Sequence, residues 1–280
     1  MTAPFADYLA IQAVNWSSLK QIARSPRHYR HLLANPLPDK DDFRLGRALH
    51  TLVLEPDLFH EQYAIWPAVS PTTGKKTRRA GGEWDAFESL HLNAGRTILR
   101  EQDVEGIQAM AASIHTDPTC AAWLDGMHHV EHVLRWTDRE TGMECKGRCD
   151  CITSDDILTD LKTARDHAPG AMARQASSLA YHAQLAFYLD GAQAMGLDVH
   201  GAAILAVEKS PPYDCGVLTL SDEDLEAGRS HYRALLLRLA ECRDRDEWPG
   251  VYQGKPQPLA LPSWAPGMDD EDDITITDED

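Results

Sequence analysis

The sequence ECKGRCDCITSDDILTDLKT spans residues 144–163 and carries the strongest structural signal in the chain. Two runs that alternate between apolar and polar residues flank the turn sequence TSDD, which predicts two neighbouring β-strands. Asp160 and Lys162 lie two residues apart and therefore project from one face of their strand. Asp150 reaches the same region from the neighbouring strand. We therefore expect two carboxylates and one ammonium group to converge.

Such a group of side chains suits metal-dependent hydrolysis. Carboxylates at this spacing are typical ligands of a hard divalent cation such as Mg²⁺, which prefers oxygen and keeps several of its waters. A lysine beside the ion can orient or deprotonate one of these waters. We expect a phosphodiester-hydrolysing site, with both carboxylates at solvent-facing strand ends. A D-x-K triplet also occurs at solvated strand ends that have no chemical role, so the prediction depends on further residues.

The periodicity of apolar residues predicts helices in the first part of the chain and strands after it. Residues 15–34 are expected to form two short helices that are separated at Ser25-Pro26, because proline opens a helix more readily than it continues one. Further helices are predicted at 41–56, 82–92, 101–115, 118–125, 169–180, 181–196 and 221–242. Strands are predicted at 129–136, 144–152, 156–162, 202–209 and 215–220.

Three more positions are candidates for the same site. Gln184 and Tyr188 lie four residues apart on a predicted helix and so share one helical face. Glu131 lies on the strand opposite Asp150, although an exposed strand charge is the simpler interpretation. His50 lies on an apolar helix, where a half-buried core histidine is the default interpretation.

Charge is distributed unevenly along the chain. The 280 residues carry a net charge of −17, and eight of the acidic residues lie in DDEDDITITDED at 269–280. This tail has the composition of a disordered segment, which would keep DNA off the surface, dock a basic protein or simply aid solubility. The loop at 67–82 holds the candidate DNA-binding residues Lys75, Lys76, Arg78 and Arg79. A solvated surface loop is an equally good interpretation of these residues.

The six cysteines do not indicate a disulfide scaffold, because they are too sparse for a chain of this length. Cys145, Cys149 and Cys151 cluster, but their spacing matches no standard zinc or iron–sulfur motif. We expect these three side chains to share one strand face and to pack as small apolar groups. No segment approaches the roughly 20 apolar residues of a membrane span, and no secretory signal is evident, which favours a cytoplasmic protein.

In this order, the pattern D-x9-D-x-K followed by Q-x3-Y resembles the PD-(D/E)xK nuclease superfamily and its RecB-like branch. The chain is similar in particular to the RecE (exonuclease VIII) group of phage recombination exonucleases. Four motifs carry this resemblance: GRALHTLVLEP (46–56), KGRCDCI (146–152), DLKT (160–163) and YHAQLAFYLDG (181–191). The resemblance implies an α/β restriction-endonuclease-like core, a central mixed β-sheet flanked by helices, with a helical N-terminal extension.

The resemblance also implies a role for each candidate residue. The catalytic residues would be Asp150, Asp160, Lys162 and His50, and Gln184 and Tyr188 would support the site or hold DNA. The metal ligands would be Asp150, Asp160, His50 and the main-chain carbonyl of Leu161, with Glu131 as an open candidate and Glu208 as a lesser one. The second acid is Asp where many members of the superfamily have Glu, which shortens one arm of the metal site.

The activity implied is a Mg²⁺-dependent exodeoxyribonuclease, with Mn²⁺ as an alternative ion. It would degrade the 5′ strand at double-stranded DNA ends and leave 3′ tails for a single-strand annealing protein. The resemblance further implies a homo-oligomeric ring around DNA in the host cell of a phage or prophage. A protein that is monomeric at micromolar concentration by light scattering would exclude this ring.

The resemblance suggests a division into three parts, with the helical part and His50 at 1–126, the nuclease core at 127–248, and the tail at 249–280. Two alternatives stay open at this level. The first is an endonuclease or flap-type nuclease on the same fold. The second is a non-catalytic binding module or an acidic DNA mimic that uses the strong negative charge to occupy a partner's DNA site.

Overall fold

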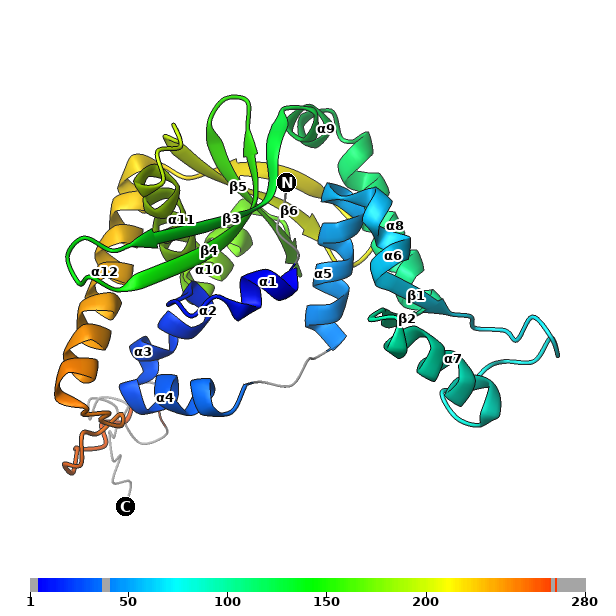
Figure 1. Ribbon diagram of the computed structural model, residues 1–280. Helices are drawn as coiled ribbons and strands as arrows, with labels where there is room; N and C mark the ends of the chain where they lie inside the picture. The colour runs from blue at the N-terminus through cyan, green and yellow to red at the C-terminus, as the bar shows by residue number, and fades with distance from the viewer. Residues whose placement is uncertain (1–4, 37–40, 263–264, 266–280) are drawn as a thin grey trace, which may run out of the picture.

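The computed structural model describes residues 5–36, 41–262 and 265. A five-stranded mixed sheet with the order β3-β4-β5-β6-β7 forms its centre (Figure 1). The strands are β3 (Met127–Thr137), β4 (Glu144–Thr153), β5 (Ile157–Ala164), β6 (Gly201–Glu208) and β7 (Cys215–Thr219). Within this five-stranded sheet only β5 and β6 run parallel, so the chain must cross over between them, and it does so through α10 (Pro169–Leu179) and α11 (Tyr181–Ala194).

The two central strands β4 and β5 pair over a very short distance. Their register consists of Cys151 opposite Thr159 and Ile152 opposite Leu158. The long pairing of β4 with β3 and of β5 with β6 continues past this point. β4 and β5 therefore diverge immediately beyond the last pair, which is where Asp150 and Asp160 lie.

One face of the sheet is covered by α11, and α12 (Asp222–Arg245) packs on α11 (Figure 1). α11 is apolar nearly all round its circumference, as expected for a helix buried between a sheet and a second helix. The short helices α2 (Trp16–Leu19), α3 (Gln21–Arg24) and α4 (Pro26–Ala34) contribute Trp16, Leu19, Ile22 and Tyr29 to the same core. This N-terminal segment therefore folds together with the sheet.

The opposite face carries a second core. Leu161, Leu205 and Val207 alternate with the residues of the first core and pack against helices α5 (Asp41–Leu54) and α8 (Glu101–Thr116). A short parallel pair, β1 (Tyr63–Trp66) and β2 (Thr97–Arg100), extends this side together with α7 (Gly82–Asn93). The remaining elements are α1 (Phe5–Ala10), η1 (Pro56–Leu58), α6 (Phe59–Gln62) and α9 (Pro118–Asp125).

The structure confirms the predicted α/β fold with its mixed, helix-flanked sheet, and it corrects several details. Residues 15–34 form three helices rather than two, because the chain also breaks at Lys20 between α2 and α3. Strands β1 and β2 were not predicted, since four-residue segments are too short to show a periodicity. Cys149 packs in the α11 core with Cys145, whereas Cys151 is buried beside Thr159 and outside that core, so the three thiols do not share one face.

The whole acidic tail at 269–280 lies outside the described residues. The three-part division of the chain stays a prediction. Within the described part of the chain, no helix has both the length and the apolar character needed to cross a membrane.

The contact between α11 and α12 requires a glycine at position 228. A Cβ atom there would lie 2.4 Å from the backbone carbonyl oxygen of His182, which cannot move without distorting α11. We expect Gly228→Ala to lower the free energy of unfolding by about 1–3 kcal/mol in urea denaturation. The control is Gly106→Ala in α8, where a Cβ atom has open space and should stabilise the helix by up to about 1 kcal/mol. Equal effects of the two substitutions would contradict this packing.

Candidate active site

Asp160 and Lys162 extend from one face of β5, as their spacing predicts. The Lys162 Nζ atom forms an ion pair with Asp160 Oδ2. Both predicted carboxylates are buried, because α11 and α5 cover the diverging strand ends: Asp150 is 7% exposed and Asp160 is 2% exposed. The expectation of solvent-facing strand ends is therefore wrong. The site is an enclosed polar cluster, in which every charge needs a partner.

Asp150 uses the gap between β4 and β5. Its Oδ2 atom accepts a hydrogen bond of 2.6 Å from the Leu161 N–H, which β4 would occupy in a continuous ladder. The N–H and the carbonyl of one strand residue point to the same strand edge. The Leu161 carbonyl therefore also faces the gap, on the side of Asp150.

His50 and Glu131 complete a group of three potential metal ligands with Asp150. The His50 Nδ1 atom lies 3.3 Å from Asp150 Oδ2, and one ligand atom from each of the three residues lies within 4.8 Å of the others. Glu131 is buried and pairs with Arg148, with 2.7 Å between Oε2 and Nε. The exposed strand charge is thus the wrong interpretation of Glu131. His50 is half-buried, as the default interpretation has it, and its ring faces Asp150.

The backbone at Glu131 has an unusual conformation for a strand. Its φ angle is +48°, in the left-handed region that a residue with a side chain seldom adopts. Such strain persists only where surrounding structure enforces it, and it is found preferentially at functional sites. Here it accompanies the turning of the Glu131 carboxylate toward Asp150 and His50.

Gln184 and Tyr188 approach the cluster from α11. The Gln184 Oε1 atom accepts a hydrogen bond from Lys162 Nζ at 3.3 Å, while its Nε2 atom donates to Asp160 Oδ1 at 3.2 Å. The same Nε2 atom lies 3.5 Å from the Tyr188 hydroxyl. One amide therefore holds both members of the Asp160–Lys162 pair, and Tyr188 buttresses the amide.

The charges of the cluster set its protonation. Burial alone would lower the pKa of His50, but Asp150 beside it, with Glu131 and Asp160, raises it to about 9. Burial would raise the pKa of Asp150, yet His50, Lys162 and the Leu161 N–H lower it. Burial also opposes charge on Lys162, but the two aspartates raise its pKa. Burial and the Asp150 charge raise the pKa of Asp160.

The donor set fits a divalent cation. Two carboxylates and an imidazole converge from β3, β4 and α5, which is a mixture of ligands that suits Mg²⁺ or Mn²⁺ with additional waters. Asp160 is not part of this group, because both of its oxygens face Lys162 and Gln184. Its predicted role as a ligand stays a prediction, as does that of the Leu161 carbonyl. The Glu208 carboxylate accepts a hydrogen bond of 2.8 Å from the main-chain N–H of His167, which is not a member of this group.

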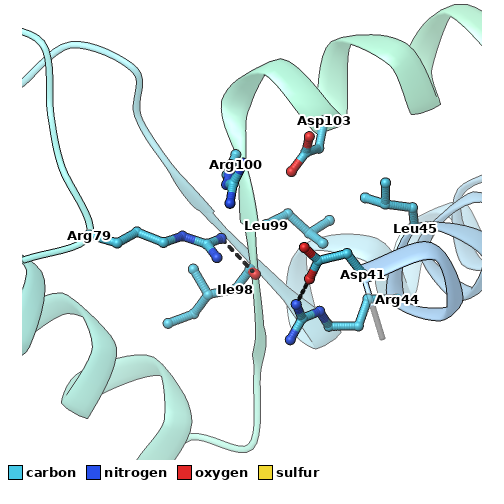
Figure 2. A pocket seen from close by; sticks show the side chains of 8 residues that line it. All are labelled: Asp41, Arg44, Leu45, Arg79, Ile98, Leu99, Arg100 and Asp103. Carbon is cyan, nitrogen blue, oxygen red and sulfur yellow. Dashed lines mark hydrogen bonds and ion pairs between the residues drawn. The ribbon is translucent and has the colours of Figure 1, made fainter. Parts of the chain in front are cut away.

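The basic loop lies apart from this cluster. Lys75, Lys76, Arg78 and Arg79 belong to the segment between β1 and α7, which projects beyond α5 at the right of Figure 1. Arg79 folds back, because its guanidinium donates to the Ile98 carbonyl at 3.4 Å (Figure 2). The same guanidinium lies over the ring of Trp84. The small pocket beside it has a volume of about 10 Å³, room for one water molecule.

Three residues of the site were not identified from the sequence. Arg148 pairs with Glu131. Its position within the KGRCDCI motif is the sequence signal that could have identified it. Gly147 leaves room for the Tyr188 ring, since a Cβ atom there would lie 2.7 Å from it. Lys20 shows no sequence signal; burial, followed by the charge of Lys162, lowers its pKa.

The ion pair between His50 and Asp150 has a measurable consequence in chelator-treated protein. The pKa of His50 is about 9 in the fold, above its usual value of about 6.5. The protonated imidazole therefore stabilises the folded protein, and this stabilisation is fully present at pH values below about 6.5. This stabilisation is lost as the pH rises through the folded-state value. We expect NMR titration of His50 to show the raised pKa and Asp150→Asn to lower it. Titration of His50 at its ordinary value would contradict the ion pair.

Comparison with solved structures supports the fold. The crystal structure of a "putative exonuclease" from Eubacterium rectale superimposes with a TM-score of 0.58 at 12% sequence identity, covering 94% of this chain and 97% of that one. A phage-related exonuclease from Haemophilus somnus 129PT gives a TM-score of 0.35 at 14% identity, over 86% of this chain and 99% of the other. Only the first value is high enough to bear on the fold.

No curated protein matches the chain. The family match, in contrast, covers most of the sequence: the profile described as PDDEXK-like domain of unknown function (DUF3799) matches residues 15–256. This range includes the five-stranded sheet, both covering helix layers and every residue of the polar cluster. The match confirms the predicted resemblance to the PD-(D/E)xK superfamily. The chain therefore belongs to the DUF3799 family of PDDEXK-like domains.

Proposed function

We propose that the protein is a metal-dependent deoxyribonuclease that degrades double-stranded DNA from its ends. The observation that carries this proposal is the buried cluster in the gap between β4 and β5. There Asp150 lies beside His50 and Glu131, and Asp160 lies beside Lys162. Carboxylates, an imidazole and a lysine in one enclosed site are the groups that metal-assisted phosphodiester hydrolysis requires.

The finer description rests on sequence motifs. The resemblance of four motifs to RecE-like exonucleases supports 5′-to-3′ polarity, a 3′ single-stranded product and a role in annealing-type recombination. The fold shared with a protein described as an exonuclease agrees with action at DNA ends. The ring assembly and the annealing partner rest on the motif resemblance alone.

His50, Glu131 and Asp150 would hold the cation, which we propose to be Mg²⁺ or Mn²⁺, with Asp160 and the Leu161 carbonyl as further ligands. When bound, such an ion polarises a phosphoryl oxygen and lowers the pKa of a water. His50 would bind such a cation through a neutral imidazole. Lys162 and Arg148 would keep their positive charges.

Lys162 acts in its protonated form. Its raised pKa makes it an ammonium group at neutral pH, so it serves as a donor and a positive charge rather than as a general base. Gln184 fixes this ammonium group beside Asp160. Its proposed role is to orient the attacking water and to stabilise the negative charge that develops on the phosphate.

Substitution of Lys162 tests this role. We expect Lys162→Ala to lower the rate of DNA cleavage by about 10²–10³-fold, the usual cost of losing one preorganised charge-stabilising group. Binding of DNA in the presence of Ca²⁺ should change little. The matched control is Lys209→Ala, an exposed lysine just beyond β6, which should cleave at the wild-type rate. Full activity in folded Lys162→Ala protein would refute the mechanism.

The substrate is tested with a linear duplex labelled separately at its 5′ and 3′ ends, beside a covalently closed circle. We expect Mg²⁺-dependent loss of the 5′ label from the linear duplex and no cleavage of the circle. Asp160→Asn, which preserves the shape of the buried side chain, should be inactive, and circular dichroism should show that it remains folded.

The other outcomes of this assay discriminate between functions. Cleavage of the circle would replace the exonuclease by an endonuclease on the same fold. Loss of the 3′ label first would reverse the proposed polarity. Inactivity of wild-type protein on both substrates with Mg²⁺ and with Mn²⁺ would refute the proposed nuclease activity.

A further inference from the structure

A second group of metal-binding side chains lies where α9 and β7 begin, and it shares no residue with the candidate active site. Cys120 and Cys215 are buried, with 0% and 9% of their surface exposed. Their sulfur atoms are 3.8 Å apart, although 95 residues separate them in the sequence. Asp117 adds a carboxylate, so that one ligand atom from each residue lies within 4.8 Å of the others. We propose that Asp117, Cys120 and Cys215 form a zinc-binding site.

Local structure positions the first two ligands. Asp117 is the N-cap of α9, and its Oδ1 atom accepts the Cys120 N–H at 2.8 Å. This bond brings the carboxylate and the thiol of Cys120 to the same side of the first helical turn. The cap uses only part of the capacity of the carboxylate, which has two oxygens with two lone pairs each.

Tertiary contacts position the third ligand. The Ser113 hydroxyl donates a hydrogen bond of 2.6 Å to the Tyr213 carbonyl and lies 3.7 Å from the Cys215 sulfur. α8 therefore fixes the segment that leads into β7, and with it the Cys215 thiol. The three ligands come from two parts of the fold that are already held in place.

The separation of the sulfur atoms agrees with tetrahedral zinc. With Zn–S bonds of about 2.3 Å and a tetrahedral angle, two thiolates on one ion lie about 3.8 Å apart. The observed distance between the Cys120 and Cys215 sulfurs is 3.8 Å. An ion could therefore be accommodated without moving the two sulfurs relative to each other. A disulfide, in contrast, would require them to approach to about 2.05 Å.

The chemistry of the ligands selects the metal. Two thiolates favour a soft or borderline cation, and the additional carboxylate favours Zn²⁺ over Cu⁺. Burial raises the pKa of the Cys120 thiol, so this thiol is protonated before metal binds. Binding breaks two S–H bonds, releases two protons to solvent and forms two Zn–S bonds, with no change of oxidation state.

The fourth position of the site faces the surface. Asp117 and Ser113 are partly exposed, whereas both cysteines are buried, so the ion would enter from the side of the carboxylate. A water molecule or the Ser113 hydroxyl would complete the coordination. The bound ion would join α9 to β7 at the edge of the sheet and stabilise the second core.

Cobalt substitution tests the site without reference to nuclease activity. EDTA-treated, reduced full-length protein is titrated with Co²⁺. We expect the near-ultraviolet charge-transfer band of cobalt thiolate and the strong visible bands of a four-coordinate ion, both displaced by one equivalent of Zn²⁺. The oxygen-rich cluster of His50, Glu131 and Asp150 has no thiol and cannot give the charge-transfer band. Zinc at about one hundred times its Kd should raise the Tm by about 5 °C or more.

Variants assign the signal to these residues. Cys120→Ser and Cys215→Ser should each abolish the charge-transfer band, and Asp117→Asn, which retains both thiols, should weaken Zn²⁺ binding at least about tenfold. Cys242→Ser, a buried cysteine on α12, is the control and should bind as wild type does. Absence of the band in folded wild-type protein would overturn the proposal. So would a band that persists in both cysteine variants, or a Cys120–Cys215 disulfide that forms in protein unable to bind Zn²⁺.

Discussion

The candidate active site depends on the separation of β4 from β5 after only two residue pairs. Because the two strands pair only at Cys151–Thr159 and Ile152–Leu158, the backbone of Leu161 has no strand partner on the β4 side. Its N–H is satisfied by the Asp150 carboxylate instead. A buried N–H without such a partner would be costly, so the gap and the buried aspartate stabilise each other.

Charge balance allows this gap to remain buried. Three carboxylates, those of Glu131, Asp150 and Asp160, each have a cationic partner within ion-pair distance. The partners come from β4, β5 and α5, so the cluster exists only when the sheet and the covering helices are assembled. With a divalent ion bound, His50 would be neutral, which would limit the change in net charge. The fold therefore presents three paired carboxylates in a region from which water is largely excluded.

Two places in the fold offer different kinds of metal ligand. On the active-site side, oxygen ligands and one imidazole converge beside a lysine, an arrangement suited to hard cations and to hydrolysis. At the other group, two thiols lie in an apolar core with a single carboxylate at its edge. The chemical softness of the ligands alone would favour a different metal ion at each of these two groups of side chains. The first arrangement supports a reaction, whereas the second would stabilise the junction of α9 with β7.

Local sequence was sufficient for the helices longer than one or two turns, for the five strands of the main sheet, and for placing Asp160 beside Lys162 and Gln184 near Tyr188. These predictions succeed because i, i+2 spacing in strands and i, i+4 spacing in helices are properties of a single element. Burial of Asp150 and Asp160, the inward turn of Glu131 and the pairing of Cys120 with Cys215 were decided only by tertiary structure. Each depends on how separate elements pack, over as many as 95 residues for the two thiols, and no periodicity within one element encodes such a contact.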